Sequence, residues 1–343
     1  MFMKNILKKI IKKQNKILFG NLISKRSQNI IFPLVNSLNE DINDLTSYID
    51  KHDPSFLKER DERDLQKLFK ARLGIPLNLQ KPETFNEKLQ WLKVHYRRPE
   101  MTIMADKYKV RGFLEHVGYG KYLNDLYGVY QNTNQLLKDM DKLPKAFVVK
   151  ANHWSGGNVV VKDKTKLDVA ELKKLDMLLD RNYYYRKVKI YLENKVHFVC
   201  KGEWQYKNID PCLIVEKYLE DISGALTDYK IFCFNGTPHY IQVDLDRFVN
   251  HTRCFYDINW NKQEFTSRYP LFMGNIPRPS NLNEMLDVAG KLSQSYPYLR
   301  VDFYVPGNRI IFGEFTFYHE TGMGEFNPVG WDKKLGELIE LRY

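Results

Sequence analysis

Cysteine and long apolar runs are scarce in this chain of 343 residues. No two of its four cysteines form a C-x-x-C pair, so we expect buried free thiols and no zinc or disulfide framework. No stretch of 18 or more apolar residues occurs, and we therefore expect no transmembrane helix. Lysines interrupt the apolar residues at the start, and no small-residue cleavage site follows them. We therefore expect no signal peptide and a cytoplasmic location.

The common nucleotide-binding and catalytic motifs are also missing. There is no G-x-x-x-x-G-K-[ST] P-loop and no G-x-G-x-x-G fingerprint, so any nucleotide site must be of another kind. H-E-x-x-H and G-x-S-x-G do not occur, nor do the kinase triplets H-R-D and D-F-G.

Acidic residues do not occur before Glu40, and this local absence accounts for most of the net charge of +11. Residues 1–26 carry +8, which leaves only +3 for the other 317 residues. A body built to neutralise a phosphate backbone is therefore not supported, and we expect no nucleic-acid partner.

Residues 1–26 form a basic amphipathic N-terminal segment. Apolar residues recur at mostly helical spacing over 2–19, with lysines on the other face. Such a helix can lie on an anionic membrane surface, where each lysine adds about 1 kcal/mol. A peripheral location at the inner face of the cell membrane is one interpretation. A helix packed on the body, or a disordered tail, is the other.

Beyond this segment we expect a helical region over 27–99 and a mixed region over 100–343. Thr84 and Glu87 have the spacing of a capping box, which predicts a helix starting there. Further helices are predicted over 101–117, 167–182, 281–295 and 331–341. Strands are predicted over 147–150, 159–162, 213–219, 228–235, 239–244, 299–304 and 309–315. Strands in hairpins with helices between them indicate an α+β fold.

Two stretches have the chemistry of a nucleotide site. The strand that ends at Lys150 is followed by a glycine loop, Ser155, Gly156, Gly157 and Asn158. Glycines let backbone N–H groups approach phosphate oxygens, although a plain hairpin turn is the more common reason for such a loop. The second stretch is an apolar strand that ends in Glu216, Lys217 and Leu219. The backbone at Lys217 and Leu219 could bond adenine, with Glu216 or Glu220 near the ribose; a charged strand end is the plainer interpretation.

The third stretch contains Arg300, Asp302, Glu314 and Thr316 on two adjacent strands. Alternation puts Arg300 and Asp302 on one face of their strand. Two carboxylates and a nearby hydroxyl are hard oxygen ligands suited to Mg²⁺, and Arg300 could stabilise a developing oxyanion. A cross-strand ion pair between Arg300 and Glu314 is the alternative. A fourth stretch, Asp106 and Lys107 at a predicted helix start, is by itself only a charged helix end.

In order and spacing, these stretches resemble the ATP-grasp superfamily. The resemblance implies that Lys107 and Lys150 contact phosphates, that 155–158 is the glycine loop, and that 216–219 is the adenine hinge. It makes Arg300 the oxyanion residue and assigns Mg²⁺ to Asp302 and Glu314. Thr316 stands where that superfamily usually has Asn.

More closely, the chain resembles the TupA-like ATP-grasp family. The similar segments are TFNEKLQW (84–91), ADK (105–107), EWQYKN (203–208), DYKIFCFNG (228–236), QVDLDR (242–247) and WDKKLG (331–336). They cover roughly residues 80–343, and residues 186–202 look like an insertion.

This resemblance implies an ATP cleft between about 146–219 and 228–343, with ATP and Mg²⁺ as cofactors. It implies a carboxylate–amine ligase that joins an amino acid to a uronic acid or another amino acid in a cell-surface or capsular polysaccharide, as in teichuronopeptide formation. Lys230, on one strand face with Asp228, would reach the γ-phosphate. Arg247 and Arg253 are candidates for holding an anionic substrate.

Two other functions compete with this one. The triplet Asp244-Leu245-Asp246 matches the D-x-D pattern with which many glycosyltransferases hold a metal and a sugar diphosphate. The helical character of the first 117 residues disagrees with the βαβ core expected for that class. The third hypothesis is a non-catalytic nucleotide- or glycan-binding protein, which the Thr316 substitution favours.

Overall fold

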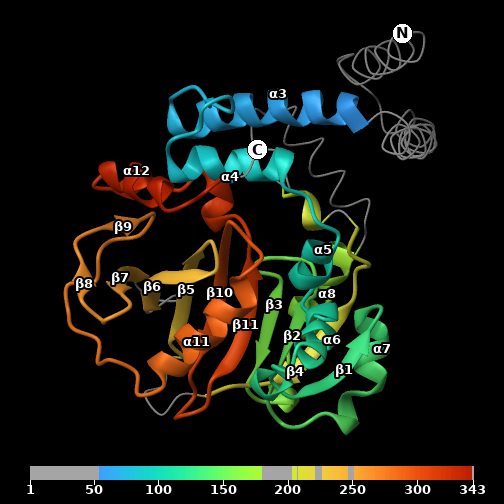
Figure 1. The fold of residues 1–343 in the computed structure, drawn as a ribbon. Coiled ribbons are helices and arrows are strands. Elements are labelled where there is room, and N and C mark those ends of the chain that lie inside the picture. The colour runs from blue at the N-terminus through green and yellow to red at the C-terminus, as the bar shows by residue number, and fades with distance from the viewer. Residues whose placement is uncertain (1–53, 180–202, 207, 221–225, 246–250, 342–343) are drawn as a thin grey trace, which may run out of the picture. The chain divides into compact units, whose positions relative to one another are not determined.

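A computed structural model describes residues 54–179, 203–206, 208–220, 226–245 and 251–341 (Figure 1). Contacts divide the chain into two units, Met1–Arg60 and Asp61–Tyr343. The basic segment 1–26 and the insertion 186–202 lie outside the described residues, as do Asp246 and Arg247.

The second unit starts within helix α3 (Pro54–Leu73), which is followed by α4, α5 and α6 (Phe85–His95, Glu100–Ala105 and Lys109–His116). The capping box of α4 is confirmed. The Thr84 hydroxyl accepts from the Glu87 N–H at 3.2 Å, and the Glu87 carboxylate accepts from the Thr84 N–H at 3.1 Å. The helix expected over 101–117 is interrupted between α5 and α6. Asp106 ends α5, and its carboxylate accepts from the N–H groups of Tyr108 and Lys109.

A four-stranded antiparallel sheet forms one half of this unit, in the order β1-β4-β2-β3. Its strands are Leu126–Tyr130, Phe147–Ala151, Asn158–Val161 and Leu213–Lys217 for β1 to β4. Alternation along β2 buries Phe147, Val149 and Ala151 in one core. Helices α7, α8 and α9 (Thr133–Lys138, Val169–Lys173 and Asp176–Leu179) contribute to this half, so the helix expected from 167 is in two pieces.

A six-stranded antiparallel sheet forms the other half, in the order β11-β10-β5-β6-β7-β8. Its strands are Asp228–Phe234, Thr237–Leu245, Thr252–Asp257, Lys262–Gln263, Tyr298–Tyr304 and Ile311–Thr316 for β5 to β8, β10 and β11. Strands β9 (Thr266–Ser267) and β12 (Phe326–Asn327) form a small separate sheet. The hairpin expected at Asn235 and Gly236 is confirmed, and both residues have positive φ. Strands β7, β8 and β9 were not expected from the sequence.

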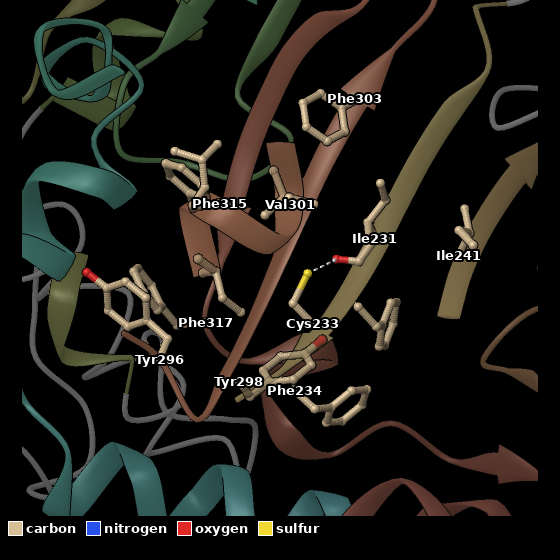
Figure 2. Packing of buried hydrophobic residues seen from close by; sticks show 14 of the residues in the cluster. Ile231, Cys233, Phe234, Ile241, Tyr296, Tyr298, Val301, Phe303, Phe315 and Phe317 are labelled. Atoms are coloured by element: carbon tan, nitrogen blue, oxygen red, sulfur yellow. Dashed lines mark hydrogen bonds between the residues drawn. The ribbon is translucent and has the colours of Figure 1, made fainter. Parts of the chain in front are cut away.

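The larger core lies against this second sheet. Helix α11 (Leu282–Ser293) packs on β5, β6 and β10 (Figure 1). Val301 and Phe303 of β10 lie with Ile231 and Cys233 of β5 in this core (Figure 2). Since the odd positions of β10 face this core, alternation turns Arg300 and Asp302 to the other face. Cys212, Cys233 and Cys254 are free and buried, as expected.

The remaining elements connect these layers. Helix α12 (Gly330–Glu337) packs on α4, where the Asn86 N–H donates to Asp332 at 2.9 Å. The 3-10 turns are η1 to η5 (Gly120–Tyr122, Met140–Lys142, Lys164–Lys166, Trp204–Tyr206 and His319–Gly322). Within the described ranges, no helix is long and apolar enough to cross a bilayer.

Candidate active site

A pocket opens where the two sheets approach each other, and both contribute residues to it. Lys150 and Glu216 come from the small sheet, and Phe312 and Gly313 come from the large one. The rest of the lining comes from α6 and the residues around it: Lys107, Val110, Arg111, Leu123 and Asn124. The structure therefore brings together Lys107, Lys150 and Glu216, as the sequence predicts.

Glu216 is the acidic centre of this pocket. Its carboxylate accepts from Lys150 Nζ at 2.6 Å and from Arg111 Nη1 at 3.2 Å. Because both oxygens already have cationic partners, Glu216 holds Lys150 and Arg111 in place. Its contact with a ribose stays a prediction. The pocket thus has three cationic side chains, Lys107, Lys150 and Arg111, and one carboxylate. Its net charge is positive, which suits phosphate oxygens.

Lys107 is tethered to the loop that follows β2. Its N–H donates to the Asn152 carbonyl at 2.9 Å, and its Nζ donates to the Trp154 carbonyl at 3.2 Å. Asn152 in turn donates to the Asp106 carboxylate at 2.9 Å. These contacts fix Lys107 beside the glycine loop, although the loop residues themselves do not line the pocket.

The two loop glycines have different roles in this structure. Gly156 has a φ of +79°, a conformation that favours glycine, and it is exposed together with Ser155 and Asn158. Gly157 is buried, and a Cβ there would lie 2.7 Å from Leu178 Cδ1. A side chain at Gly157 would thus displace Leu178, whereas the backbone near Gly156 is accessible to a ligand.

The expected adenine hinge is partly engaged within the protein. The Lys217 N–H donates to the Asp125 carbonyl at 2.9 Å, and the Lys217 carbonyl accepts from Asn124 Nδ2 at 2.8 Å. A carbonyl has two lone pairs, so the Lys217 oxygen retains one acceptor position. Leu219 follows at the end of the same segment and is half-buried.

Arg300 and Asp302 form a two-pronged ion pair on β10. Arg300 Nε and Nη2 donate to the two Asp302 oxygens, each at 2.7 Å. Lys230 of β5 lies 3.3 Å from the same carboxylate. Burial alone would raise the pKa of Asp302, but Arg300 and Lys230 outweigh it and hold this pKa below its usual value. The predicted common face is confirmed, and Arg300 has Asp302 as its main partner, with Glu314 farther away.

Glu314 connects this pair to the pocket. It lies opposite Asp302 in the β10–β11 ladder, and Thr316 lies opposite Arg300. Its side chain is 41% exposed, and its carboxylate is 3.5 Å from Lys107 Nζ and 3.9 Å from Arg300 Nη2. Two carboxylates and a hydroxyl on neighbouring strands are the kind of hard oxygen donors that Mg²⁺ prefers, but Arg300 engages both oxygens of Asp302 in this conformation. In the described part of the chain, no group of three or more His, Cys, Asp or Glu side chains is arranged to hold a metal ion.

A buried ionic network continues behind Asp302. Lys230 is 6% exposed and pairs with Asp228, and its Nζ lies 4.0 Å from Asp244. Asp244 accepts from Arg253 Nε at 2.6 Å, directly across the β6–β7 ladder. Burial alone would raise the pKa of Asp244, but Arg253 outweighs it and the pKa is lowered.

This network corrects two expectations from the sequence. Asp244 is 3% exposed and bonded to Arg253, so it is not presented as the first acid of a D-x-D motif. Arg253 is also 3% exposed, and it donates to the Ser267 carbonyl and to Glu320 in addition to Asp244. Its donors are used inside the protein, so the geometry does not offer it to a substrate.

Two residues that the sequence did not indicate complete the centre. His319 Nδ1 lies 3.0 Å from Arg300 Nη1, and burial lowers the pKa of His319 to about 3. Glu320 accepts from Arg253 at 3.2 Å and from Arg268 at 2.7 Å. Burial alone would raise the pKa of Glu320, but His319, Arg253 and Arg268 outweigh it and lower the pKa to about 2. Both residues lie in the η5 turn, where no periodicity marks them.

Comparison with known proteins gives the family. The model of the family described as TupA-like ATPgrasp matches residues 87–340. The chain belongs to the TupA-like ATPgrasp family. This assignment confirms the expected ATP-grasp fold and supports an ATP-binding ligase. No curated protein matches the chain significantly.

Several solved structures of ATP-grasp ligases are distantly similar. D-alanine–D-alanine ligase from Bacillus anthracis is 19% identical, with 63% of this chain and 56% of that chain covered and a TM-score of 0.34. Phosphoribosylamine–glycine ligase from Thermotoga maritima is 12% identical, with 63% and 48% covered and a TM-score of 0.37. The ATP-grasp ligase PsnB, complexed with a precursor variant, Mg and ADP, is 9% identical, with 74% and 63% covered and a TM-score of 0.39. The chain thus spans little more than half of the D-alanine–D-alanine ligase chain.

Proposed function

We propose that this TupA-like ATPgrasp protein is an ATP- and Mg²⁺-dependent carboxylate–amine ligase. The observation that carries the proposal is the position of Glu314 between two groups of charges. Its carboxylate is 3.5 Å from Lys107 of the cationic pocket and 3.9 Å from Arg300. A nucleoside triphosphate in the pocket would therefore extend its terminal phosphate toward Asp302, Glu314 and Arg300.

The assigned roles follow from the charges of the side chains. Lys107 and Lys150 would contact phosphate oxygens, with the backbone near Gly156 closing on them. The Lys217 carbonyl and Leu219 would bond adenine. Asp302, Glu314 and Thr316 would hold Mg²⁺, which supplies positive charge to the phosphate oxygens when bound. Asp228 and Lys230 lie behind this set. Three carboxylates surround Lys230, so its contact with the γ-phosphate stays a prediction.

The proposed reaction has two steps. A carboxylate oxygen attacks the γ-phosphorus of ATP, the bond to the bridging oxygen breaks, and ADP leaves. An amine then attacks the acyl carbon, phosphate leaves with the broken C–O bond, and the amine loses a proton. Arg300 would stabilise the negative charge that develops on the acyl oxygen, because its guanidinium is fixed before the reaction starts.

The substrates and the location come from the family resemblance. We propose an amino acid as one substrate and a uronic acid or a second amino acid of a surface-polysaccharide precursor as the other. The domain limits 27–99 and 100–343 and the candidate substrate residue Arg247 also stay predictions. Membrane contact through residues 1–26 is tested by a liposome pull-down. Equal binding of the full chain and of a 1–26 deletion would contradict it.

A non-catalytic nucleotide-binding protein is the second candidate. The observation that favours it is the engagement of both Asp302 oxygens by Arg300, which opposes metal binding in this conformation. Isothermal titration with Mg²⁺-ATP, combined with an assay of ADP release, separates the two candidates. The non-catalytic protein is expected to bind ATP but to release no ADP in the presence of any amine and carboxylate pair. The burial of Asp244 argues against the glycosyltransferase, which would instead release UDP from a UDP-sugar.

A further inference from the structure

A second cavity, of about 290 Å³, lies between α3 and the η5 turn. It is lined by Leu68 and Arg72 of α3 and by Arg268, Glu320, Thr321, Met323, Gly324 and Glu325. None of these residues lines the pocket between the sheets. Its volume is close to the lower end for small-molecule sites, roughly 300 Å³. The cavity is therefore separate from the proposed ATP pocket and large enough for a small organic molecule.

The backbone around this cavity is strained. Arg268, Glu320 and Thr321 have φ values of 65°, 44° and 57°. They are three of the five non-glycine residues with positive φ in the described part of the chain. Such conformations persist only where the surroundings hold them, and they concentrate at ligand sites.

Two buried side chains of α4 supply that support. Lys93 Nζ donates to the Thr321 carbonyl at 2.6 Å, and Gln90 Nε2 donates to the same carbonyl at 3.0 Å. Both Lys93 and Gln90 are 0% exposed. The Thr321 carbonyl is thus held inside the protein while the Glu320 and Thr321 side chains line the cavity.

The cavity lining carries two arginines, Arg72 and Arg268, and two glutamates, Glu320 and Glu325, so its formal charges balance. Glu320 is bonded to both Arg253 and Arg268, so its charge is compensated. Arg268 remains 54% exposed and can donate to a ligand. Arg72 forms no ion pair among the described residues. Glu325 is exposed at the rim and is the one acid there that would oppose an anion.

Two hydroxyl groups near the cavity lack partners: Thr321 lines the cavity, whereas Ser267, which precedes the lining residue Arg268, does not. In the described structure, the buried Ser267 Oγ and Thr321 Oγ1 have no hydrogen-bond partner, and Ser267 is 0% exposed. A Cβ on Gly324 would lie 3.1 Å from Ser267 Oγ and 3.1 Å from the Glu320 Cβ. A side chain at 324 would therefore fill the space between them, and glycine keeps it open. Buried hydroxyl groups without partners are costly, and an oxygen bound in the cavity would satisfy that of Thr321.

We propose that this cavity binds a small organic carboxylate. The guanidinium groups of Arg72 and Arg268 hold its carboxylate oxygens in forked, charge-assisted hydrogen bonds. The hydroxyl of Thr321 bonds one of its oxygens, and Leu68 and Met323 contact its carbon atoms. The site does not depend on ATP or on the ligase activity proposed above.

Isothermal titration of the full chain with succinate tests the proposal. Succinamide, which has the same shape without charge, is the ligand control. Arg72→Gln is the test variant, because Arg72 is exposed and its replacement leaves the core intact. Lys70→Gln is the matched control, since Lys70 is also exposed on the last turn of α3 but does not line the cavity.

The wild-type chain is expected to bind succinate at least tenfold more tightly than succinamide. Arg72→Gln is expected to weaken succinate binding at least tenfold, and Lys70→Gln is expected to leave it unchanged. Absence of succinate binding by the wild type, or equal binding by the two variants, overturns the proposal. ATP affinity is measured on the same samples, so failure of the ATP pocket and failure of this cavity give different results.

Discussion

Nη1 of Arg300 lies 3.0 Å from Nδ1 of His319, and both residues are buried. Because a guanidinium only donates hydrogen bonds, Nδ1 of His319 is the acceptor and its ring proton is on Nε2. With its pKa lowered to about 3 by burial, this imidazole is neutral at pH 7. Arg300 is thus fixed by Asp302 on one side and by a neutral histidine on the other.

His319 is therefore expected to position Arg300 for the ligase reaction. His319→Leu removes the acceptor, and a hydrogen bond to a charged group contributes about 1.5–3 kcal/mol. We expect kcat to fall roughly ten- to hundredfold with little change in the KM for ATP. His319→Asn, which keeps an acceptor near Nδ1, is expected to retain most of kcat. Equal losses in the two variants would mean that His319 acts through packing alone.

The same histidine makes stability depend on pH. The unfolded chain protonates this imidazole near pH 6.5 and the folded chain only near pH 3. The unfolded state therefore binds more protons in this window, and stability falls as pH drops from about 6.5 to about 3. We expect His319→Asn to reduce the slope of unfolding free energy against pH by up to about 1.4 kcal/mol per unit. An unchanged slope in urea titrations at pH 5 and 6.5 contradicts this assignment.

Lys150 is expected to contribute to ATP affinity. Lys150→Met removes a positive charge from the pocket and leaves Glu216 with Arg111 as its partner. We expect the Kd for ATP to rise roughly tenfold, which corresponds to about 1.4 kcal/mol. Lys145→Met is the control, because Lys145 is exposed and pairs with Asp163 outside the pocket. Equal Kd values for the two variants would remove Lys150 from the nucleotide site.

The two carboxylates proposed to bind the metal should respond differently when each is replaced by its uncharged amide. Glu314 is 41% exposed, so Glu314→Gln is expected to abolish turnover and leave the melting temperature nearly unchanged. Asp302 is enclosed by Arg300 and Lys230, and breaking such a buried pair costs about 3–5 kcal/mol. Asp302→Asn is therefore expected to lose both activity and stability. Thermal melts and ADP release, with exposed Glu171→Gln as the control, check both statements.

Local patterns in the sequence predict much of this fold because their causes are local. The capping box at Thr84 and Glu87, the hairpin at Asn235 and Gly236, and the common face of Arg300 and Asp302 all involve neighbours in the chain. The interruption of the helix at Asp106 was missed. The Asp106 carboxylate accepts there from the N–H groups of Tyr108 and Lys109, and it also accepts from Asn152, which comes from a distant loop.

The contacts within the site were harder to predict because they join distant segments. Lys150 and Glu216 are 66 positions apart, and no spacing rule pairs their side chains. Asp302 is the main partner of Arg300, and Glu314 is not, because Asp302 is buried and the Glu314 side chain is partly exposed. The alternation of side chains along two strands does not predict this difference in burial. Glu320 and Thr321 adopt left-handed backbone conformations in a tertiary environment, so no periodicity indicated their role or that of His319.

Release of ADP and phosphate tests the central claim most directly. The full chain is incubated with Mg²⁺-ATP, a panel of amino acids and a uronic-acid oligosaccharide, beside the Glu314→Gln variant. The proposed ligase predicts stoichiometric ADP and phosphate only when both an amine and a carboxylate substrate are present, and none from the variant. UDP release from a UDP-sugar with ATP untouched, or ADP release that Glu314→Gln does not reduce, would contradict it.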